Sequence, residues 1–285
     1  MSPRNNKERT STKEVGAPPP PTPNPSVSKE SPLSFVTPTE FVDLPSKGEF
    51  YPQGHALCGQ DTVEIRYMTA KDEDILTSRA LLKKGVAIER LLQNIIVDKS
   101  VNPADLLLGD RNAILVAARA TGYGADYSTS LNCPACGQFV EHTFDLNQST
   151  VNSGDTDSKD ITKTDDGTFV IRIPKMNLDI ETRLLTGRDE TNLTKTSASK
   201  KKHNLGESLL TDQLRQYIVS VNGDASREMI NALIENMPAY DSRFLRHHYQ
   251  AVVPNIDLTQ DFECDNCGTE QKMEVPFTAD FFWVK

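Results

Sequence analysis

The sequence predicts an α+β, mainly helical fold in which two pseudo-repeated helical lobes with short strands are joined by a four-cysteine ribbon. Three observations lead to this prediction. Apolar residues recur at helical spacing over most of the chain, whereas alternating, strand-like segments are few and short. A segment of the first half is repeated in the second half, and each half carries one Cys-x-x-Cys-Gly motif.

Composition and charge limit the classes of protein to consider. The chain has 285 residues, 37% of them hydrophobic, with a formal net charge of -9 and a pI near 5.1. No apolar run approaches the ~18–20 residues of a membrane span, and the N-terminus lacks the apolar region of a secretory signal. We therefore expect a soluble chain that is made in a cytoplasm. The negative charge argues against a protein whose main task is to coat nucleic acid, because that task needs a basic face.

Three segments are expected along the chain: a disordered Pro-rich tail over residues 1–34, a first repeat over 35–146 and a second repeat over 147–285. The tail is assigned by composition, since residues 1–32 hold 8 of the 17 prolines and Ser, Thr, Asn and Lys fill most of the rest. Such a segment is expected to tether the chain or to become ordered on a partner. A PxxP ligand for an adaptor protein is the alternative.

Periodicity assigns the elements in order. Strands are expected at residues 63–68, 169–173 and 180–185. Helices are expected at residues 72–83, 88–97, 103–108, 111–121, 208–221, 226–236 and 241–252. Two polar stretches without periodicity, 148–167 and the lysine-rich 195–203, are predicted to be surface loops. The alternative for the second stretch is a contact with an acidic partner surface or with nucleic acid.

The internal repeat is clearest in two segments that align without a gap, Val63–Thr77 and Ile180–Thr194. Both contain the pattern Glu-x-Arg-x-x-Thr-x-x-Asp-Glu, in which Thr is expected to cap a helix and the acids to lie in its first turn. Asp110 and Asp241 also match, since each lies 23 residues before the first cysteine of its motif. Tandem duplication accounts for these matches and predicts two pseudo-equivalent lobes.

Four of the five cysteines form two close pairs, Cys133 and Cys136 in CPACG and Cys264 and Cys267 in CDNCG. This spacing brings two thiolates about one tetrahedral edge apart, and Gly supplies the positive φ that closes the turn. Strand-like sequence flanks both motifs, so we expect two facing hairpins that form a four-cysteine zinc ribbon. Four thiolates leave no open position for water, which makes the predicted Zn²⁺ site structural.

Other chemistries find less support in the sequence. A redox Cys-x-x-Cys pair is the alternative to metal binding, but it suits a thioredoxin-like βαβ context, which the sequence lacks. Cys58 stands alone and is expected to be a core or surface thiol. No P-loop, dinucleotide-binding glycine motif, nucleophile elbow or HExxH motif occurs. A structural or assembly protein is therefore favoured over an enzyme.

A proline-bounded turn, LPSKGEFYP, occupies Leu44–Pro52. Proline fixes φ at both ends, Ser-Lys-Gly is turn chemistry, and two aromatic rings offer an anchor to a core or to a neighbour. Together with VEIRYMTAKDEDIL, ARATGYGADY (Ala118–Tyr127) and CPACG, this motif resembles the T-even (T-four-type) bacteriophage baseplate hub protein family. The resemblance covers roughly residues 40–146, weakens through 147–259 and returns at CDNCG.

The resemblance implies a non-enzymatic component of a contractile phage tail, located in the virion tail baseplate after assembly in the host cytoplasm. The implied partners are other baseplate and tail proteins in a multi-subunit assembly, without nucleic acid and without a membrane span. A nucleic-acid-associated zinc-ribbon protein is the alternative function. The residues expected to contact partners lie in the turn and in the aromatic chain end: Leu44, Pro45, Ser46, Lys47, Gly48, Phe50, Tyr51, Pro52, Phe281, Phe282 and Trp283. For the chain end, packing of the rings between the ribbon and the core is the competing interpretation.

Overall fold

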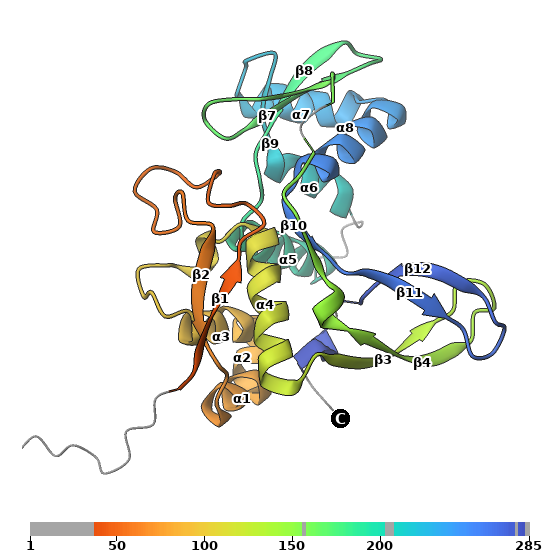
Figure 1. Cartoon of the computed structure of the whole chain (residues 1–285). Helices are drawn as coiled ribbons and strands as arrows, with labels where there is room; N and C mark the ends of the chain where they lie inside the picture. The colour runs from red at the N-terminus through yellow and green to blue at the C-terminus, as the bar shows by residue number, and fades with distance from the viewer. Residues whose placement is uncertain (1–36, 156–157, 203–207, 277–278, 283–285) are drawn as a thin grey trace, which may run out of the picture. The chain divides into compact units, whose positions relative to one another are not determined.

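Groups of helices and groups of short antiparallel strands follow one another along the chain (Figure 1). The structure is a computed structural model that describes residues 37–155, 158–202, 208–276 and 279–282. Of these residues, 41% are helical and 26% lie in strands. No helix among them is both long enough and apolar enough to cross a membrane. The tail predicted over residues 1–34 lies outside the described residues.

The described residues contain eight α-helices and three short 3-10 helices. The α-helices are α1 (Ala70–Thr77), α2 (Arg79–Lys84), α3 (Ala87–Ile95), α4 (Leu108–Tyr123), α5 (Gly187–Lys202), α6 (Leu209–Tyr217), α7 (Arg227–Asn236) and α8 (Ala239–Val252). The 3-10 helices are η1 (Pro103–Asp105), η2 (Leu146–Gln148) and η3 (Ala279–Phe282).

The strands form five small antiparallel sheets within the described part of the chain. The two-stranded sheets are β1–β2 (Thr39–Asp43, Thr62–Arg66), β3–β4 (Asp126–Asn132, Phe139–Asp145), β5–β10 (Thr150–Asn152, Asn255–Asp257) and β11–β12 (Thr259–Glu263, Glu270–Glu274). The four-stranded sheet has the order β6–β7–β8–β9 (Ile161–Lys163, Phe169–Ile173, Leu178–Thr182, Ile218–Val221). Strand β5 follows the first cysteine motif and β10 precedes the second cysteine motif. Their pairing therefore brings the two halves of the chain together next to these motifs.

Helix α4 contributes much of the buried apolar surface, with Ala113, Ile114, Leu115, Val116 and Ala118 each at most 3% exposed. Its first turn contains Gly109, where an added Cβ would overlap the carbonyl oxygen of Pro254. The chain entering β10 therefore passes against α4 only because this residue has no side chain.

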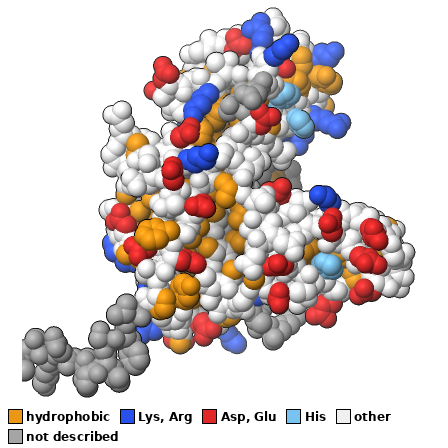
Figure 2. Space-filling model, viewed as in Figure 1, with side chains coloured by type: hydrophobic (Ala, Val, Ile, Leu, Met, Phe, Trp, Pro, Cys, Tyr) orange, Lys and Arg blue, Asp and Glu red, His pale blue; other side chains and the backbone are white. Residues whose placement is uncertain are grey.

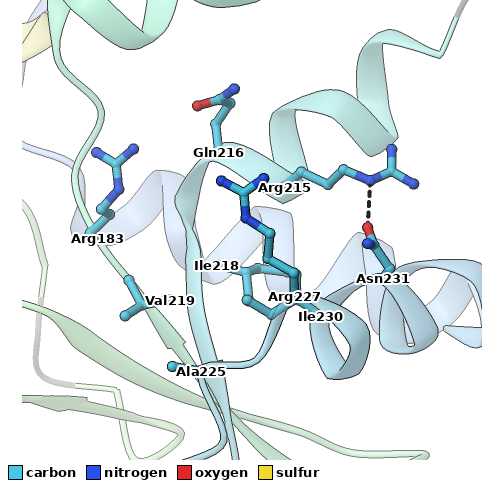
Figure 3. Close-up of a pocket in the computed structure, with 9 residues that line it drawn as sticks. All are labelled: Arg183, Arg215, Gln216, Ile218, Val219, Ala225, Arg227, Ile230 and Asn231. Atoms are coloured by element: carbon cyan, nitrogen blue, oxygen red, sulfur yellow. Dashed lines mark hydrogen bonds between the residues drawn. The ribbon is translucent and has the colours of Figure 1, made fainter.

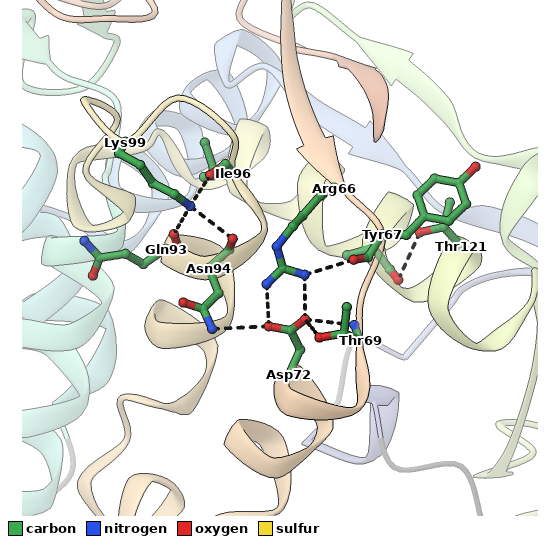
Figure 4. Close-up of polar contacts among 10 residues, drawn as sticks. Arg66, Tyr67, Thr69, Asp72, Gln93, Asn94, Ile96, Lys99 and Thr121 are labelled. Carbon is green, nitrogen blue, oxygen red and sulfur yellow. Dashed lines mark hydrogen bonds and ion pairs between the residues drawn. The ribbon is translucent and has the colours of Figure 1, made fainter. Parts of the chain in front are cut away.

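The junction between β2 and α1 is fixed by a buried carboxylate (Figure 4). Asp72 is fully buried and binds the guanidinium of Arg66 through two contacts, of 2.7 and 2.9 Å. The same carboxylate accepts the N–H and the hydroxyl of Thr69, at 2.8 and 2.9 Å, as expected for a helix cap. Asn94 on α3 also donates to Asp72, at 3.3 Å. Nearby, Lys99 donates to three carbonyl groups at the C-terminal end of α3, those of Gln93, Asn94 and Ile96.

The junction between β8 and α5 repeats these contacts. Asp189 binds Arg183 through two contacts of 2.8 Å and accepts the N–H and the hydroxyl of Thr186, both at 2.9 Å. The aligned pattern of the two halves thus encodes one local structure that occurs twice.

The prediction of a mainly helical fold with two repeated helical lobes is wrong. Strands make up 26% of the described residues and lie in several small sheets. The two equivalent junctions also lie in different surroundings. β2 belongs to a two-stranded sheet and β8 to the middle of a four-stranded one, while α1 is followed by α2 and α3 but α5 runs unbroken for 16 residues. Tertiary pairing therefore gives the repeated segments different neighbours.

Three local predictions are also corrected. The expected loop 148–167 contains β5 and β6, and the end of the helix expected at 208–221 is the strand β9. The lysine-rich stretch continues α5 as far as Lys202, while His203 lies outside the described residues. Strands of three or four residues carry too little sequence to show a period, and Ala and Lys are good helix formers on an exposed face.

Candidate metal centre

The four paired cysteines lie at the turns of two β-hairpins (Figure 1). In the first hairpin, β3–β4, the N–H of Gly137 donates to the carbonyl of Cys133 at 2.8 Å, and Gly137 has a φ of 72°. In the second, β11–β12, Gly268 donates to Cys264 at 2.8 Å with a φ of 66°. Glycine is required at both turns because other residues rarely adopt this φ.

The hairpins bring all four sulfur atoms within 4.8 Å of one another. Between the hairpins, Cys133 Sγ lies 3.8 Å from Cys267 Sγ, and Cys136 Sγ lies 3.9 Å from Cys264 Sγ. A tetrahedral ion with Zn–S bonds of about 2.3 Å has sulfur–sulfur edges of about 3.8 Å. The donor set and its spacing therefore fit one four-thiolate metal site.

Local hydrogen bonds favour the thiolate form at the two sulfurs that are less buried. The hydroxyl oxygen of Thr269 lies 3.3 Å from the sulfur of Cys267 and, with the Thr269 N–H, lowers the pKa of this thiol to about 6. The N–H of Gln138 lowers the pKa of Cys136. Burial raises the pKa of Cys264 to about 11, and a bound cation would reverse that effect.

A second set of contacts joins the two hairpins away from the sulfurs. The side-chain amide of Gln260 on β11 accepts the N–H of Asp145 at 3.0 Å and donates to its carbonyl at 2.7 Å, as a paired strand would. The ring of His142 packs edge-on against Phe144 and Phe262, with centroid distances of 4.6 and 5.1 Å. The hairpins are thus held together along their length as well as at their turns.

The outer faces of the hairpins are acidic, as Figure 2 shows over this part of the molecule. Glu263 and Glu270 stand directly opposite each other across β11–β12. Lys272 is the one Lys or Arg within residues 126–145 and 259–274, against eight acids: Asp126, Glu141, Asp145, Asp261, Glu263, Asp265, Glu270 and Glu274. Such a surface repels a phosphate backbone, which disfavours the alternative of a nucleic-acid-binding ribbon.

The turn at Leu44–Pro52 has a buried side that is built around Asp110 of α4. The Asp110 carboxylate is fully buried and accepts the N–H of Ser46 at 2.9 Å, the Ser46 hydroxyl at 2.6 Å and the Tyr51 hydroxyl at 2.7 Å. Burial raises the pKa of Asp110, and these donors offset part of the increase. Leu44 and Pro45 are also buried, while an added Cβ at Gly48 would overlap the backbone at Leu57 and Gln60.

The rest of the turn faces outward. Lys47 and Pro52 are exposed, and Phe50 is half-buried with its ring 5.5 Å from that of Phe169. Glu49 pairs with Lys163 at 2.6 Å. The turn therefore bridges α4 and the four-stranded sheet and leaves a small exposed surface.

The aromatic chain end packs next to the ribbon. Phe281 and Phe282 are at most 3% exposed, and Phe281 meets the ring of Tyr127 on β3 at 5.0 Å. The buried guanidinium of Arg119 donates to the carbonyl of Phe281 at 2.9 Å. Trp283 lies outside the described residues.

Sequence reasoning did not assign roles to Gln260, Arg119 or Asp110. Of these three residues, only Asp110 had a signal in the sequence, namely its match with Asp241 in the internal repeat. Asp241 is also fully buried. Asp241 accepts the N–H groups of Lys175 and Met176 at 2.9 and 2.8 Å. Each of the two matched aspartates thus binds a turn that precedes it in the chain.

Comparison with known proteins adds one match. Residues 37–283 match the family model described as T4 bacteriophage base plate protein. No curated protein and no solved structure matches the chain.

Proposed function

Because the chain belongs to the T4 bacteriophage base plate protein family, we propose that it is a structural component of the baseplate hub that acts through protein–protein contacts. The family match over residues 37–283 is the observation that carries this proposal. It bears out the resemblance seen in the sequence, and it implies a place in the virion tail beside other tail components. The position in the hub and the mode of action belong to the proposal.

We propose that Cys133, Cys136, Cys264 and Cys267 hold one structural Zn²⁺. The sulfur spacing supports this assignment, as does the tetrahedral thiolate set that zinc adopts in structural sites. The ion would clamp two hairpins that the chain joins only through a long intervening segment. With four thiolates on the ion, no coordination position is left for a substrate, so the proposed role of the ion is structural. The non-enzymatic role that we propose for the chain rests on the family match.

The proposed contact surface includes the outward side of the Leu44–Pro52 turn, where Lys47 and Pro52 are exposed and Phe50 is half-buried. The buried side holds the turn rigid, so its exposed side chains are positioned before a partner binds. Assembly with baseplate and tail proteins would take place in the host cytoplasm, before the particle is complete.

Cryo-electron microscopy of purified virions tests the proposal. We expect density for this chain at the centre of the baseplate, in contact with tube or spike proteins. Density in the outer baseplate only, or a finished particle without the chain, would contradict the assignment to the hub.

A further inference from the structure

A concave pocket lies beside β9, between the strand and helices α6 and α7 (Figure 3). Its volume is about 730 Å³, and its lining includes Arg183, Arg215 and Arg227 but no acidic residue. In a chain with a net charge of -9, three guanidinium groups around one pocket are suited to an anion, although two of them already pair with carboxylates that lie outside its lining.

The three arginines differ in how far their hydrogen bonds are already satisfied. Arg183 is bound to Asp189 through two contacts of 2.8 Å, while Arg215 donates to Asn231 at 3.0 Å and pairs with Asp212 at 3.4 Å. Arg227 makes no hydrogen bond or ion pair with any of the described residues, and the side chain of Gln216 makes none either. In Figure 3 Arg215 turns toward Asn231, whereas Arg227 extends on the side where Gln216 and Arg183 lie. A free guanidinium and a free amide therefore stand ready for a ligand on that side.

The remaining lining is largely aliphatic and belongs in part to an edge strand. Ile218, Val219 and Ile230 contribute apolar surface, and β9 is the last strand of its sheet. The pairing of β8 with β9 is irregular at this point, because Thr182 pairs with Ile218 and Glu181 with Ser220. Val219 is the extra residue between them, and such bulges redirect side chains at sheet edges.

From these contacts we propose that the pocket binds an acidic, partly apolar peptide segment of another tail protein. Carboxylates of the segment would meet Arg227 and the outer edge of Arg183, and an aliphatic side chain would cover Val219 and Ile230. A nucleic acid fits less well, since the lining offers no aromatic ring on which a base could stack, whereas its aliphatic side chains suit a peptide. The inference rests on the proposed function for its choice of a protein partner.

The direct test uses the full chain with zinc and a pair of synthetic peptides, acetyl-Asp-Glu-Ile-Asp-Glu-Leu-amide and its neutral form acetyl-Asn-Gln-Ile-Asn-Gln-Leu-amide. Binding is followed by NMR of the arginine Nε–H signals at low salt. We expect the acidic peptide to bind at least tenfold more tightly than the neutral one and to shift the Arg227 signal. Arg227→Glu should remove at least nine-tenths of this affinity, while the matched change Arg243→Glu on α8 should leave it unchanged.

Three outcomes would overturn the proposal: equal affinity for both peptides, undiminished binding to the Arg227→Glu chain, or tighter binding of a ten-nucleotide oligothymidine than of the acidic peptide. Both variants are expected to keep the zinc content and melting temperature of the wild type, because these arginines are exposed. Complementation of a phage that lacks the gene separates this inference from the hub assignment. If wild-type chain is found in the hub and Arg227→Glu particles form in normal yield, only the pocket proposal fails.

Discussion

The hydroxyl group of Tyr51 donates to Asp110 Oδ2 at 2.7 Å and accepts the N–H of Leu107 at 3.1 Å. One side chain of the proline-bounded turn thus bonds both to the residue before α4 and to the carboxylate in its first turn. Since Ser46 binds the same carboxylate, the turn and the helix form one buried polar cluster. Buried clusters of this kind are costly to leave partly unsatisfied.

Asp110→Asn is expected to lower the free energy of unfolding by about 2–3 kcal/mol, because an amide replaces an oxygen that accepts two hydroxyl groups. Urea denaturation measures the loss. Tyr51→Phe is the milder change for comparison. It should lower the free energy of unfolding by about 1–2 kcal/mol, since it removes one donor to Asp110 and the acceptor for the Leu107 N–H. An Asn variant as stable as the wild type would show that the cluster does not hold the turn.

Gly109→Ala is expected to destabilise the chain by about 2 kcal/mol or more, although alanine is the better helix former. The added Cβ would overlap the carbonyl oxygen of Pro254, so α4 or β10 must move. Gly122→Ala in the same helix is the control, because its nearest neighbour is the flexible Met68 side chain at 3.2 Å. That change should be neutral or stabilise by up to about 1 kcal/mol. Equal effects at both sites would argue against the close approach at Gly109.

Cys264→Ser should abolish stoichiometric metal binding, whereas Cys58→Ser, at an exposed cysteine apart from the cluster, should leave it intact. Elemental analysis of the wild type is expected to find about one zinc per chain. Chelation should lower the melting temperature by roughly 10 °C or more, because metal binding to such sites is coupled to folding. Two zinc ions per chain, or oxidised pairs without zinc, would refute the single shared site.

Stability should fall in acid partly through Asp72 and Asp189. Burial is the largest single influence and raises the pKa of each carboxyl. The hydrogen bonds from Arg66 and Thr69 to Asp72, and from Arg183 and Thr186 to Asp189, together with the arginine charges outweigh burial, so both pKa values lie below their usual range. A carboxyl whose pKa is lower in the folded chain stabilises the fold above its unfolded pKa of about 3.9. That contribution is lost as the pH falls through the folded pKa.

We therefore expect the urea midpoint of the wild type to drop more steeply between about pH 5 and pH 3 than that of an Asp72→Asn, Asp189→Asn double variant. Both chains lose zinc in acid, so the difference in slope isolates the two carboxyls. Parallel curves for the two chains would contradict this assignment.

The sequence was informative where a local pattern determines the structure. The strand at Phe169–Ile173 was predicted with the observed bounds, and the helices α7 and α8 were predicted to within two residues at each end. The meeting of the four cysteines was predicted because Cys-x-x-Cys-Gly fixes each turn and a shared ion has a tetrahedral ligand set.

Contacts between distant segments could not be predicted in this way. The strand β9 continues directly from α6, and only its pairing with β8 makes Ile218–Val221 extended. The pairing of Gln260 with Asp145 joins residues 115 positions apart and leaves no mark in either local sequence. The arginine pocket was missed for the same reason, because Arg183 follows β8 and Arg227 begins α7, and these two segments meet only in the folded chain.

The sulfurs of Cys133 and Cys267 are 134 positions apart in the chain. At a synthesis rate of about 5–20 residues per second, the ribosome needs about 7–27 s to make that interval. For nearly all of this time the nascent chain offers an incoming ion only two of the four clustered thiols, those of Cys133 and Cys136. A chain that is cut short before Cys264 never gains the other two, so full metal capture would distinguish finished copies from incomplete ones before they join a particle.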